Sequence, residues 1–363
     1  MPATVDKHLL KAFIPGVLAP LMFVAAFVVP AHDPKPNWLP VAVAGPMSAA
    51  SPVLGPLTGV KMLRVRSAAA AADAVRDRDA YGAVVGSPRP AVDVASGASF
   101  VFATMLKQAA MRAGIAPANI HELAPLPPGD PRGAVLSLVV LALLITSITG
   151  AALAMVHLPN LTVGRREIYV AGVGVLVGMG VTAILTELNA LPGQFPAVSA
   201  LLALLVFAVA LIARFLIRLR GAGGTTLAFM FFLVMANPAA GLASAPDLLP
   251  APWKELGPLL PPGAAGDALR GTLYFGGAKI LLPVLILAGW AGAGAALNVV
   301  ADRRVRASAT GQVAQLSPSG APGTAALRVI GSVPPSRHPG SDQSRQPAVL
   351  SCSACEQSEL SRA

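Results

Sequence analysis

The apolar residues of this chain are concentrated in six long runs separated by polar segments. The runs cover residues 12–30, 134–156, 168–188, 197–217, 226–245 and 278–300. Each is long enough to cross a hydrocarbon layer of roughly 30 Å as a helix. Asn237-Pro238 interrupts the fifth run, which is typical of a helix end, a kink or a re-entrant segment. The pattern predicts an α-helical polytopic membrane protein with one transmembrane helix, a long polar segment and five further transmembrane helices.

The segment 31–133 between the first and second runs alternates between two kinds of pattern. Short apolar stretches predict strands at 38–45, 60–65, 81–85, 91–95 and 121–126. Helices are predicted at 48–57, 68–78 and 99–113, the last because Phe102, Met105, Leu106 and Ala109 recur at helical spacing. Strands that alternate with helices predict a small α/β domain.

Composition strengthens the membrane interpretation. Only 12% of the residues are charged and 55% are hydrophobic, with a mean hydropathy of +0.67. A soluble domain carries about 25% charged residues, so a lone soluble domain is excluded. The two cysteines, Cys352 and Cys355, both lie at the C-terminal end, so no disulfide framework is expected in the segment 31–133.

The net charge of +10 is explained by the positions of the basic residues. If the N-terminus is cytoplasmic, the short inner flanks carry ten of them: Lys7, Lys11, Arg165, Arg166, Arg214, Arg218, Arg220, Arg303, Arg304 and Arg306. The outer segments 189–196 and 246–277 carry two, Lys254 and Arg270. Positive residues favour the cytoplasmic side. We therefore expect a plasma-membrane protein with both termini cytoplasmic and 31–133 extracytoplasmic, and no nucleic-acid partner.

The first run has an alternative interpretation as a signal peptide. Lys7 and Lys11 precede an apolar core that ends at Val29-Pro30-Ala31, as in a secretory signal. The core is long for a signal peptide, and Pro15 and Pro20 interrupt it, which favours an uncleaved anchor. The domain boundaries are then 1–30 for the N-terminus and first helix, 31–133, 134–301 for five helices, and 302–363 for a disordered cytoplasmic tail. Both interpretations place 31–133 on the same side.

Few residues in 31–133 indicate chemistry. Ser96-Gly97 and Ser99 precede a predicted helix, either as an anion-binding N-terminus or as ordinary helix caps. Three aspartates on the helix 68–78 and beyond it form either a cation site or, because arginines lie between them, a solvated helix face: Asp73, Asp77 and Asp79. The chain has no phosphate-binding, zinc-protease or nucleophile motif. We expect no enzyme, no cofactor and no metal.

Residues 225–300 carry a resemblance to a known family. The stretches are Met235-Ala-Asn237-Pro238-Ala-Ala-Gly241, Leu249-Pro250, Leu259-Leu-Pro261-Pro262-Gly263-Ala264, Ala268-Leu269-Arg270 and Tyr274-Phe275-Gly276. Together with the order of one helix, an external domain and five helices, they resemble ABC-2-type transporter permeases, especially the YhgE/phage-infection-protein-like branch of bacterial membrane proteins.

The resemblance implies a membrane subunit of an export system that moves a hydrophobic or amphipathic substrate outward. Its partners would be membrane lipid, a separate ATPase subunit and a second copy or related subunit in a dimer. Arg165 and Arg166 lie in the turn 157–167, where such an ATPase docks, although they also suit simple positive-inside anchoring. The alternative function is a non-transporting membrane anchor whose external domain binds envelope or secretion partners.

The candidate transport residues lie near the predicted outer ends of the helices. Glu187 and Lys279 are either transport groups or side chains that reach the interface. Asn237, Pro238, Trp253 and Tyr274 mark the segment 246–277 and its approach, in which prolines forbid a long helix and the two aromatic residues suit interface anchors. This segment is either a re-entrant outer pair of short helices or a plain exposed loop.

Two further features have open interpretations. Gly174 and Gly178 in the third run form a GxxxG pattern, which suits either a dimer or translocation seam or packing within the helix bundle. Cys352 and Cys355 form a lone CxxC without the four ligands that zinc needs, so we expect inert thiols.

Overall fold

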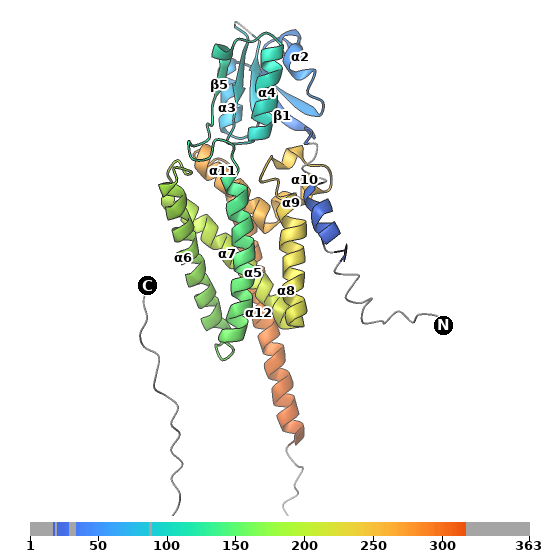
Figure 1. The fold of residues 1–363 in the computed structure, drawn as a ribbon, viewed down its shortest axis with the longest axis vertical. Coiled ribbons are helices and arrows are strands. Elements are labelled where there is room, and N and C mark those ends of the chain that lie inside the picture. Colours follow the sequence, from blue (N-terminus) through green and yellow to red (C-terminus); the bar gives the residue numbers. More distant parts are fainter. Residues whose placement is uncertain (1–16, 19, 29–33, 87–88, 317–363) are drawn as a thin grey trace, which may run out of the picture. The chain divides into compact units, whose positions relative to one another are not determined.

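The computed structural model describes residues 17–18, 20–28, 34–86 and 89–316, with the backbone alone for 305–316. Within this part of the chain the protein is mostly helical and contains one β-sheet (Figure 1). The sheet lies at one end of a set of long helices, and the turn between the first two of these helices lies at the other end.

The sheet has five strands, β1 (Leu39–Ala44), β2 (Val60–Val65), β3 (Gly82–Val85), β4 (Ala91–Val94) and β5 (Ile120–Glu122), in the order β2-β1-β3-β4-β5. β1 pairs in parallel with β2 and β3, β4 is antiparallel to β3, and β5 is parallel to β4. The predicted α/β sheet is therefore confirmed, with strand ends that differ from the prediction by a few residues.

Three helices cover the two faces of the sheet because successive side chains of a strand point to opposite sides. Val41, Val43 and Val84 pack with α2 (Met47–Leu54) and α4 (Phe100–Arg112). Ala42, Ala44 and Ala83 pack with α3 (Ala68–Arg76) on the other face. All three predicted helices are confirmed.

Five helices are long and apolar enough to cross a membrane. They are α5 (Val135–His157), α6 (Val163–Glu187), α7 (Phe195–Arg220), the continuous stretch Ala222–Ala239, and Leu281–Arg304 at the start of α12 (Leu281–Leu316). The fold is thus that of a helical membrane protein with a small α/β sheet. The described residues of the predicted first span, 17–18 and 20–28, are helical and the others lie outside the described part, so the count of six remains a prediction.

The helix predicted from the fifth apolar run differs from its prediction at both ends. It runs from Ala222 to Ala239 instead of 226–245. It consists of α8 (Ala222–Phe229), a π-helical stretch η2 (Met230–Ala236) and the single turn α9 (Asn237–Ala239). The helix stops there because Gly241 adopts a left-handed conformation with a φ of 59°, which commonly ends helices.

The prediction of a disordered tail over 302–363 is wrong for its first residues. α12 continues to Leu316. Residues 302–316 are rich in Ala, Arg and Gln and contain no proline. Such residues extend an existing helix readily, because the unfavourable nucleation step has already occurred. Residues 317–363, with Cys352 and Cys355, lie outside the described part.

The GxxxG pattern of α6 packs within the chain. A Cβ added at Gly178 would lie 2.5 Å from the Ser199 carbonyl oxygen, and one at Gly174 would lie 3.1 Å from the Ala203 oxygen. Both glycines therefore let α6 approach the backbone of α7 closely. This contact supports the interpretation of these glycines as packing positions inside the bundle.

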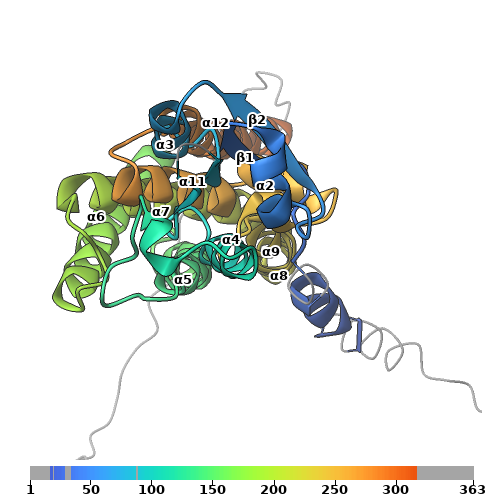
Figure 2. The ribbon, with the colours of Figure 1, turned by 90° about the horizontal axis from the view of Figure 1, so that it is seen from above.

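The segment between the fourth and fifth of these helices is folded and largely buried. It contains η3 (Pro246–Leu248), α10 (Trp253–Leu256), η4 (Gly257–Leu259) and α11 (Pro261–Tyr274). Most residues of α11 are buried, and the helix packs on α5 and α7. Figure 2 shows α11 lying across the long helices beneath the sheet. A plain exposed loop is therefore wrong, whereas its dipping into a bilayer remains a prediction.

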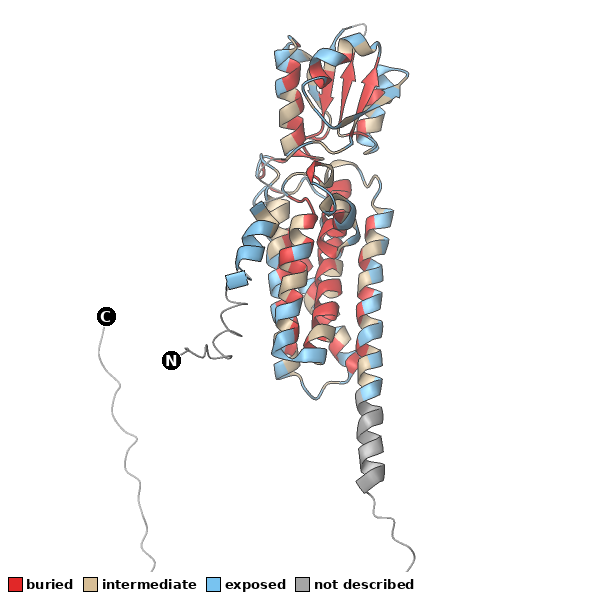
Figure 3. Ribbon diagram, turned by 90° about the vertical axis from the view of Figure 1, so that its right-hand side faces the viewer, coloured by how far each residue is buried: buried red, intermediate tan, exposed pale blue. Residues whose placement is uncertain are grey.

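The same segment completes the core of the α/β part. Ala245 and Leu248 belong to the apolar cluster beneath α2 and α4. Tyr274 and Phe275 pack against the cluster on the opposite face. Buried residues consequently continue from the sheet into the long helices (Figure 3). The segment 240–280 therefore contributes buried residues both to the long helices and to the two faces of the sheet.

Candidate functional site

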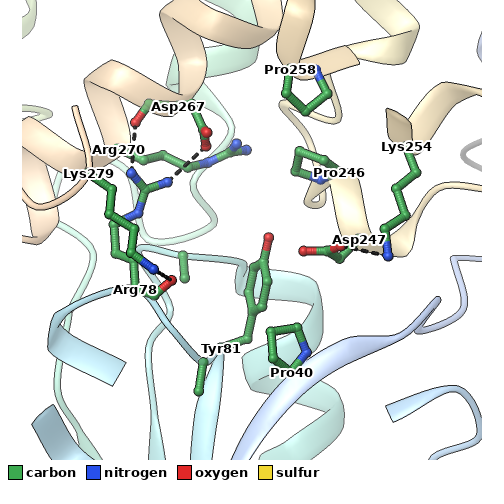
Figure 4. Close-up of a pocket in the computed structure, with 12 residues that line it drawn as sticks. Pro40, Arg78, Tyr81, Pro246, Asp247, Lys254, Pro258, Asp267, Arg270 and Lys279 are labelled. Carbon is green, nitrogen blue, oxygen red and sulfur yellow. Dashed lines mark hydrogen bonds and ion pairs between the residues drawn. The ribbon is translucent and has the colours of Figure 1, made fainter. Parts of the chain in front are cut away.

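A polar cavity of about 260 Å³ lies where the sheet meets the segment 240–280. The sheet contributes the start of β1 and the turn before β3, and the other wall comes from η3, η4 and α11 (Figure 4). Its charged lining residues are Arg78, Asp247, Lys254, Asp267, Arg270 and Lys279. Six charged side chains thus surround one space.

Three of the four cations at this cavity have a carboxylate partner. Arg78 Nη2 lies 2.8 Å from Asp267 Oδ1, and Lys254 Nζ lies 2.9 Å from Asp247 Oδ1. The third ion pair is formed by Lys279 and Asp79. The first and third pairs join the α/β part to the segment 240–280, so the charges that line the cavity also hold its two walls together.

The fourth cation, Arg270, has a different environment. It is only 6% exposed, and its guanidinium donates hydrogen bonds of 3.1 and 2.7 Å to the carbonyl oxygens of Gly241 and Leu242. Burial lowers the pKa of Arg270, and the carboxylate of Asp267, one turn earlier in α11, opposes that shift. Arginine stays protonated in proteins, so Arg270 places a full positive charge in the wall.

Two tyrosines lie close to this charge. The hydroxyl of Tyr81 points into the cavity (Figure 4), and burial, reinforced by the negative charge of Asp247, raises the pKa of Tyr81 above its ordinary value. Tyr274 packs against Gly97, and burial raises the pKa of Tyr274 to about 12. Both phenols are therefore protonated, and can donate hydrogen bonds, at neutral pH.

An apolar groove of about 190 Å³ lies on the other side of the segment 241–249. Leu138 and Leu141 of α5, Phe27, Leu242 and Leu249 supply most of its surface. Asn237, Pro238 and Ser244 add a few polar atoms. Because Leu242 lines the groove while its carbonyl holds Arg270, the groove and the polar cavity share a wall.

The predicted outer site residues are distributed over these features. Lys279 lines the polar cavity, and Asn237 and Pro238 line the apolar groove. Asn237 Oδ1 is buried and has no hydrogen-bond partner among the residues that the structure describes. Tyr274 lies under the sheet, between the two parts of the fold. Trp253 begins α10 next to Lys254, and the exposed Glu187 ends α6, away from both pockets.

The two open interpretations inside the α/β part are resolved by their contacts. Ser99 caps α4 by accepting a hydrogen bond from the Phe102 amide. Ser96 donates from its amide and its hydroxyl to the carboxylate of Glu122, at 2.8 and 2.7 Å. Asp73 pairs with Arg76 on a solvated face. No group of three potential metal ligands occurs among the described residues.

The far end of the helices holds the predicted docking residues. Arg165 is exposed, whereas Arg166 is only 6% exposed and donates to the carbonyl oxygens of Leu158 and Pro159. Arg214 is 1% exposed, and its Nε, Nη1 and Nη2 atoms have no hydrogen-bond partner in the described part of the chain. Arg165 is thus available for a partner, while Arg166 fixes the turn.

Sequence reasoning misses most of the polar cavity. The local pattern places Arg78 and Tyr81 in a helix end and a strand, and Asp267 and Arg270 in an outer loop. The two sets of positions are some 190 residues apart along the chain. A single signal points toward them: two charged residues, three positions apart, in an otherwise apolar segment 261–275.

The fold and the site together define a class, namely a helical membrane protein with an α/β part fixed over one end of its helices and a charged cavity between them. Comparison with protein-family models, with curated proteins and with solved structures yields no match.

Proposed function

We propose that this chain is the membrane subunit of an export system that moves a hydrophobic or amphipathic substrate outward. The observation that carries the proposal is the pair of neighbouring pockets on the two sides of segment 241–249, one apolar and one polar. An amphipathic molecule presents the same two kinds of surface, and ligand sites combine apolar walls with a few polar groups.

The energy source and the assembly follow from the family resemblance of residues 225–300. A separate ATPase subunit supplies the energy, and two copies or two related subunits form the path in the plasma membrane. Both termini are cytoplasmic in this proposal, which places the α5–α6 turn on the ATPase side. The exposed Arg165 is the docking residue there, because Arg166 is occupied by the carbonyl groups of its own turn.

Export is tested with proteoliposomes that contain the chain and any ATPase that co-purifies with it. We expect ATP-dependent movement of a fluorescent amphiphile. The Leu138→Trp variant should reduce it several-fold by filling the groove. The matched control is Leu153→Trp, also at an exposed position of α5 but not in the groove. Export driven by a proton gradient without ATP would overturn the proposal.

A second candidate function is a non-transporting anchor whose α/β part binds envelope or secretion partners. The observation in its favour is the free edge of the sheet. β2 is an edge strand whose Met62 is 42% exposed, and Trp38, 73% exposed, lies just before β1. A partner strand can add to such an edge. Loss of partner capture by Met62→Lys, with export absent in the unaltered chain, would favour this function.

A further inference from the structure

The polar cavity has one positive charge that its own carboxylates do not match. Arg78, Lys254 and Lys279 each pair with one aspartate. Arg270 donates only to uncharged carbonyl oxygens, and the nearby Asp267 is already bound to Arg78. The set of four cations and three carboxylates therefore leaves a single excess positive charge.

Because Arg270 is buried, its positive charge acts strongly on the charge of a ligand in the cavity. Arg270 is 6% exposed, so little water screens it, and charges interact more strongly where the surroundings are less polarisable than water. The exposed pair of Lys279 and Asp79 is screened by solvent and contributes less. The interior of the cavity therefore favours a ligand that carries one negative charge.

The size and the donors of the cavity point to a small oxyanion. A volume of about 260 Å³ holds several non-hydrogen atoms, given that one water occupies roughly 30 Å³ of liquid. Lys254 Nζ donates to Asp247 and Arg78 Nη2 donates to Asp267, so a bound phosphate would compete with these carboxylates for the donors. The Tyr81 hydroxyl points into the space (Figure 4). Several N–H and O–H donors around one cation suit the spread oxygens of a phosphate group.

We infer that this cavity binds the phosphate of an amphipathic phosphodiester whose head group has a net negative charge, with its apolar chain directed to the neighbouring groove. The groove shares Leu242 with the wall that Arg270 holds, and it offers Leu138, Leu141 and Phe27 to an alkyl chain. The inference rests on the proposed export function and deepens it, because it names the substrate class.

Binding is measured without transport, so a negative result here leaves the export test unaffected. The purified full-length chain, in neutral detergent, is titrated with dihexanoyl phosphatidylglycerol, with dihexanoyl phosphatidylcholine and with inorganic phosphate. The readouts are the thermal unfolding midpoint and the tryptophan fluorescence, since Trp253 adjoins Lys254. We expect saturable binding of phosphatidylglycerol and none of zwitterionic phosphatidylcholine.

Two variants change the charge of the cavity in opposite directions. Lys254→Gln removes a cation and should raise the dissociation constant roughly three- to tenfold, whereas Asp247→Asn removes its carboxylate partner and should lower it by a similar factor. Lys61→Gln, on the distant edge strand β2, is the control. Both variants keep a hydrogen-bonding side chain of similar size, and Arg270 itself is left unchanged because the fold depends on it.

Each outcome decides between the possible ligands. Binding of phosphatidylglycerol with opposite shifts in the two variants supports the lipid phosphate, and binding of inorganic phosphate alone supports the oxyanion site with a free ion as its source. Equal binding of the charged and zwitterionic lipids would overturn the inference. So would a dissociation constant that neither Lys254→Gln nor Asp247→Asn changes.

Discussion

Two buried arginines, one near each end of the long helices, have opposite environments. Arg270 lies under the sheet, and its guanidinium is bonded to the carbonyl oxygens of Gly241 and Leu242. Arg214 lies toward the far end of α7, more completely buried, with three nitrogens that lack partners in the described part. A buried charge without a partner costs several kcal/mol. The buried arginine under the sheet therefore has hydrogen-bond acceptors, and the one at the far end has none in the described part of the chain.

The far end also contains a matching negative group. Glu167 of α6 lies within electrostatic range of Arg214, and its Oε1 atom is buried with no hydrogen-bond partner in the described ranges. The two helices cross closely at Gly174 and Gly178. The difference between the two ends shows that the burial of an arginine does not by itself indicate its role. Arg270 is hydrogen-bonded to two carbonyl groups of the cavity wall, whereas the guanidinium of Arg214 has no hydrogen-bond partner in the described part of the chain.

The largest change in stability is expected at Arg270, the buried arginine that donates hydrogen bonds to two carbonyl groups. Arg270→Met should lower the free energy of unfolding by about 3–5 kcal/mol, because two buried carbonyl groups lose their donor and Asp267 loses a nearby cation. Thermal or denaturant unfolding in detergent measures it. Arg112→Met, at an exposed position at the end of α4, is the control and should change little. If Arg270→Met lowered the free energy of unfolding by less than about 1 kcal/mol, the hydrogen bonds of Arg270 would not distinguish it from Arg214.

The opposite sign is expected at the far end. Arg214→Met combined with Glu167→Gln removes both buried charges and keeps most of the side-chain volume, so the free energy of unfolding should rise by about 1–4 kcal/mol. The same unfolding assay measures it. A clear loss of stability in this variant would show that Arg214 has a partner in solution, such as Glu167 after a side-chain rearrangement.

The close crossing of α6 and α7 at Gly178 offers a test of intermediate size. Gly178→Ala places a Cβ against the backbone of Ser199 and Ala203, at 2.5 and 2.9 Å, and should cost about 1–3 kcal/mol. Gly180→Ala is the matched control, because nothing lies within 4 Å of its added Cβ. Equal stability of the two variants would mean that α6 and α7 are not in close contact.

The smallest effect is a pH dependence confined to the end under the sheet. Burial raises the pKa of Tyr274 to about 12 and also raises the pKa of Tyr81. Both phenols ionise more easily in the unfolded chain, near pH 10, so their contribution is intact below that pH and is lost as the pH rises through the folded-state values. Tyr274→Phe should flatten the loss of stability above about pH 10. An unchanged slope would contradict this.

The sequence is sufficient for the elements that form local patterns. The apolar runs predict four of the five long helices closely, and Val41 to Ala44 indicate a buried strand directly because both faces of β1 are covered. The C-terminal helix beyond Asp302 is missed because its polar composition resembles a disordered tail, although its alanines, arginines and glutamines extend a helix well.

The polar cavity could not be predicted, because its partners meet only through the tertiary fold. Nothing around Leu248 indicates that it completes the core of a sheet that begins some 200 residues earlier. Likewise, the sequence around Arg78 indicates only a solvated helix end. The structure shows that Arg78 Nη2 lies 2.8 Å from Asp267 Oδ1. Of the residues that line the two pockets, the sequence indicates Lys279, Asn237 and Pro238 as candidates. It does not indicate that Lys279 lines a polar cavity or that Asn237 and Pro238 line an apolar groove.

The π-helical stretch Met230–Ala236 has a consequence for how the length of this chain can vary. A π-helix winds more residues into each turn than an α-helix, so this stretch contains a surplus that a regular helix of the same length would not need. Loss of one residue there would restore regular winding and leave Asn237 and Pro238, which line the apolar groove, on nearly the same face of the helix. A single-residue deletion in this stretch would therefore be tolerated, whereas one in the regular helix α8 would turn both residues away from the groove.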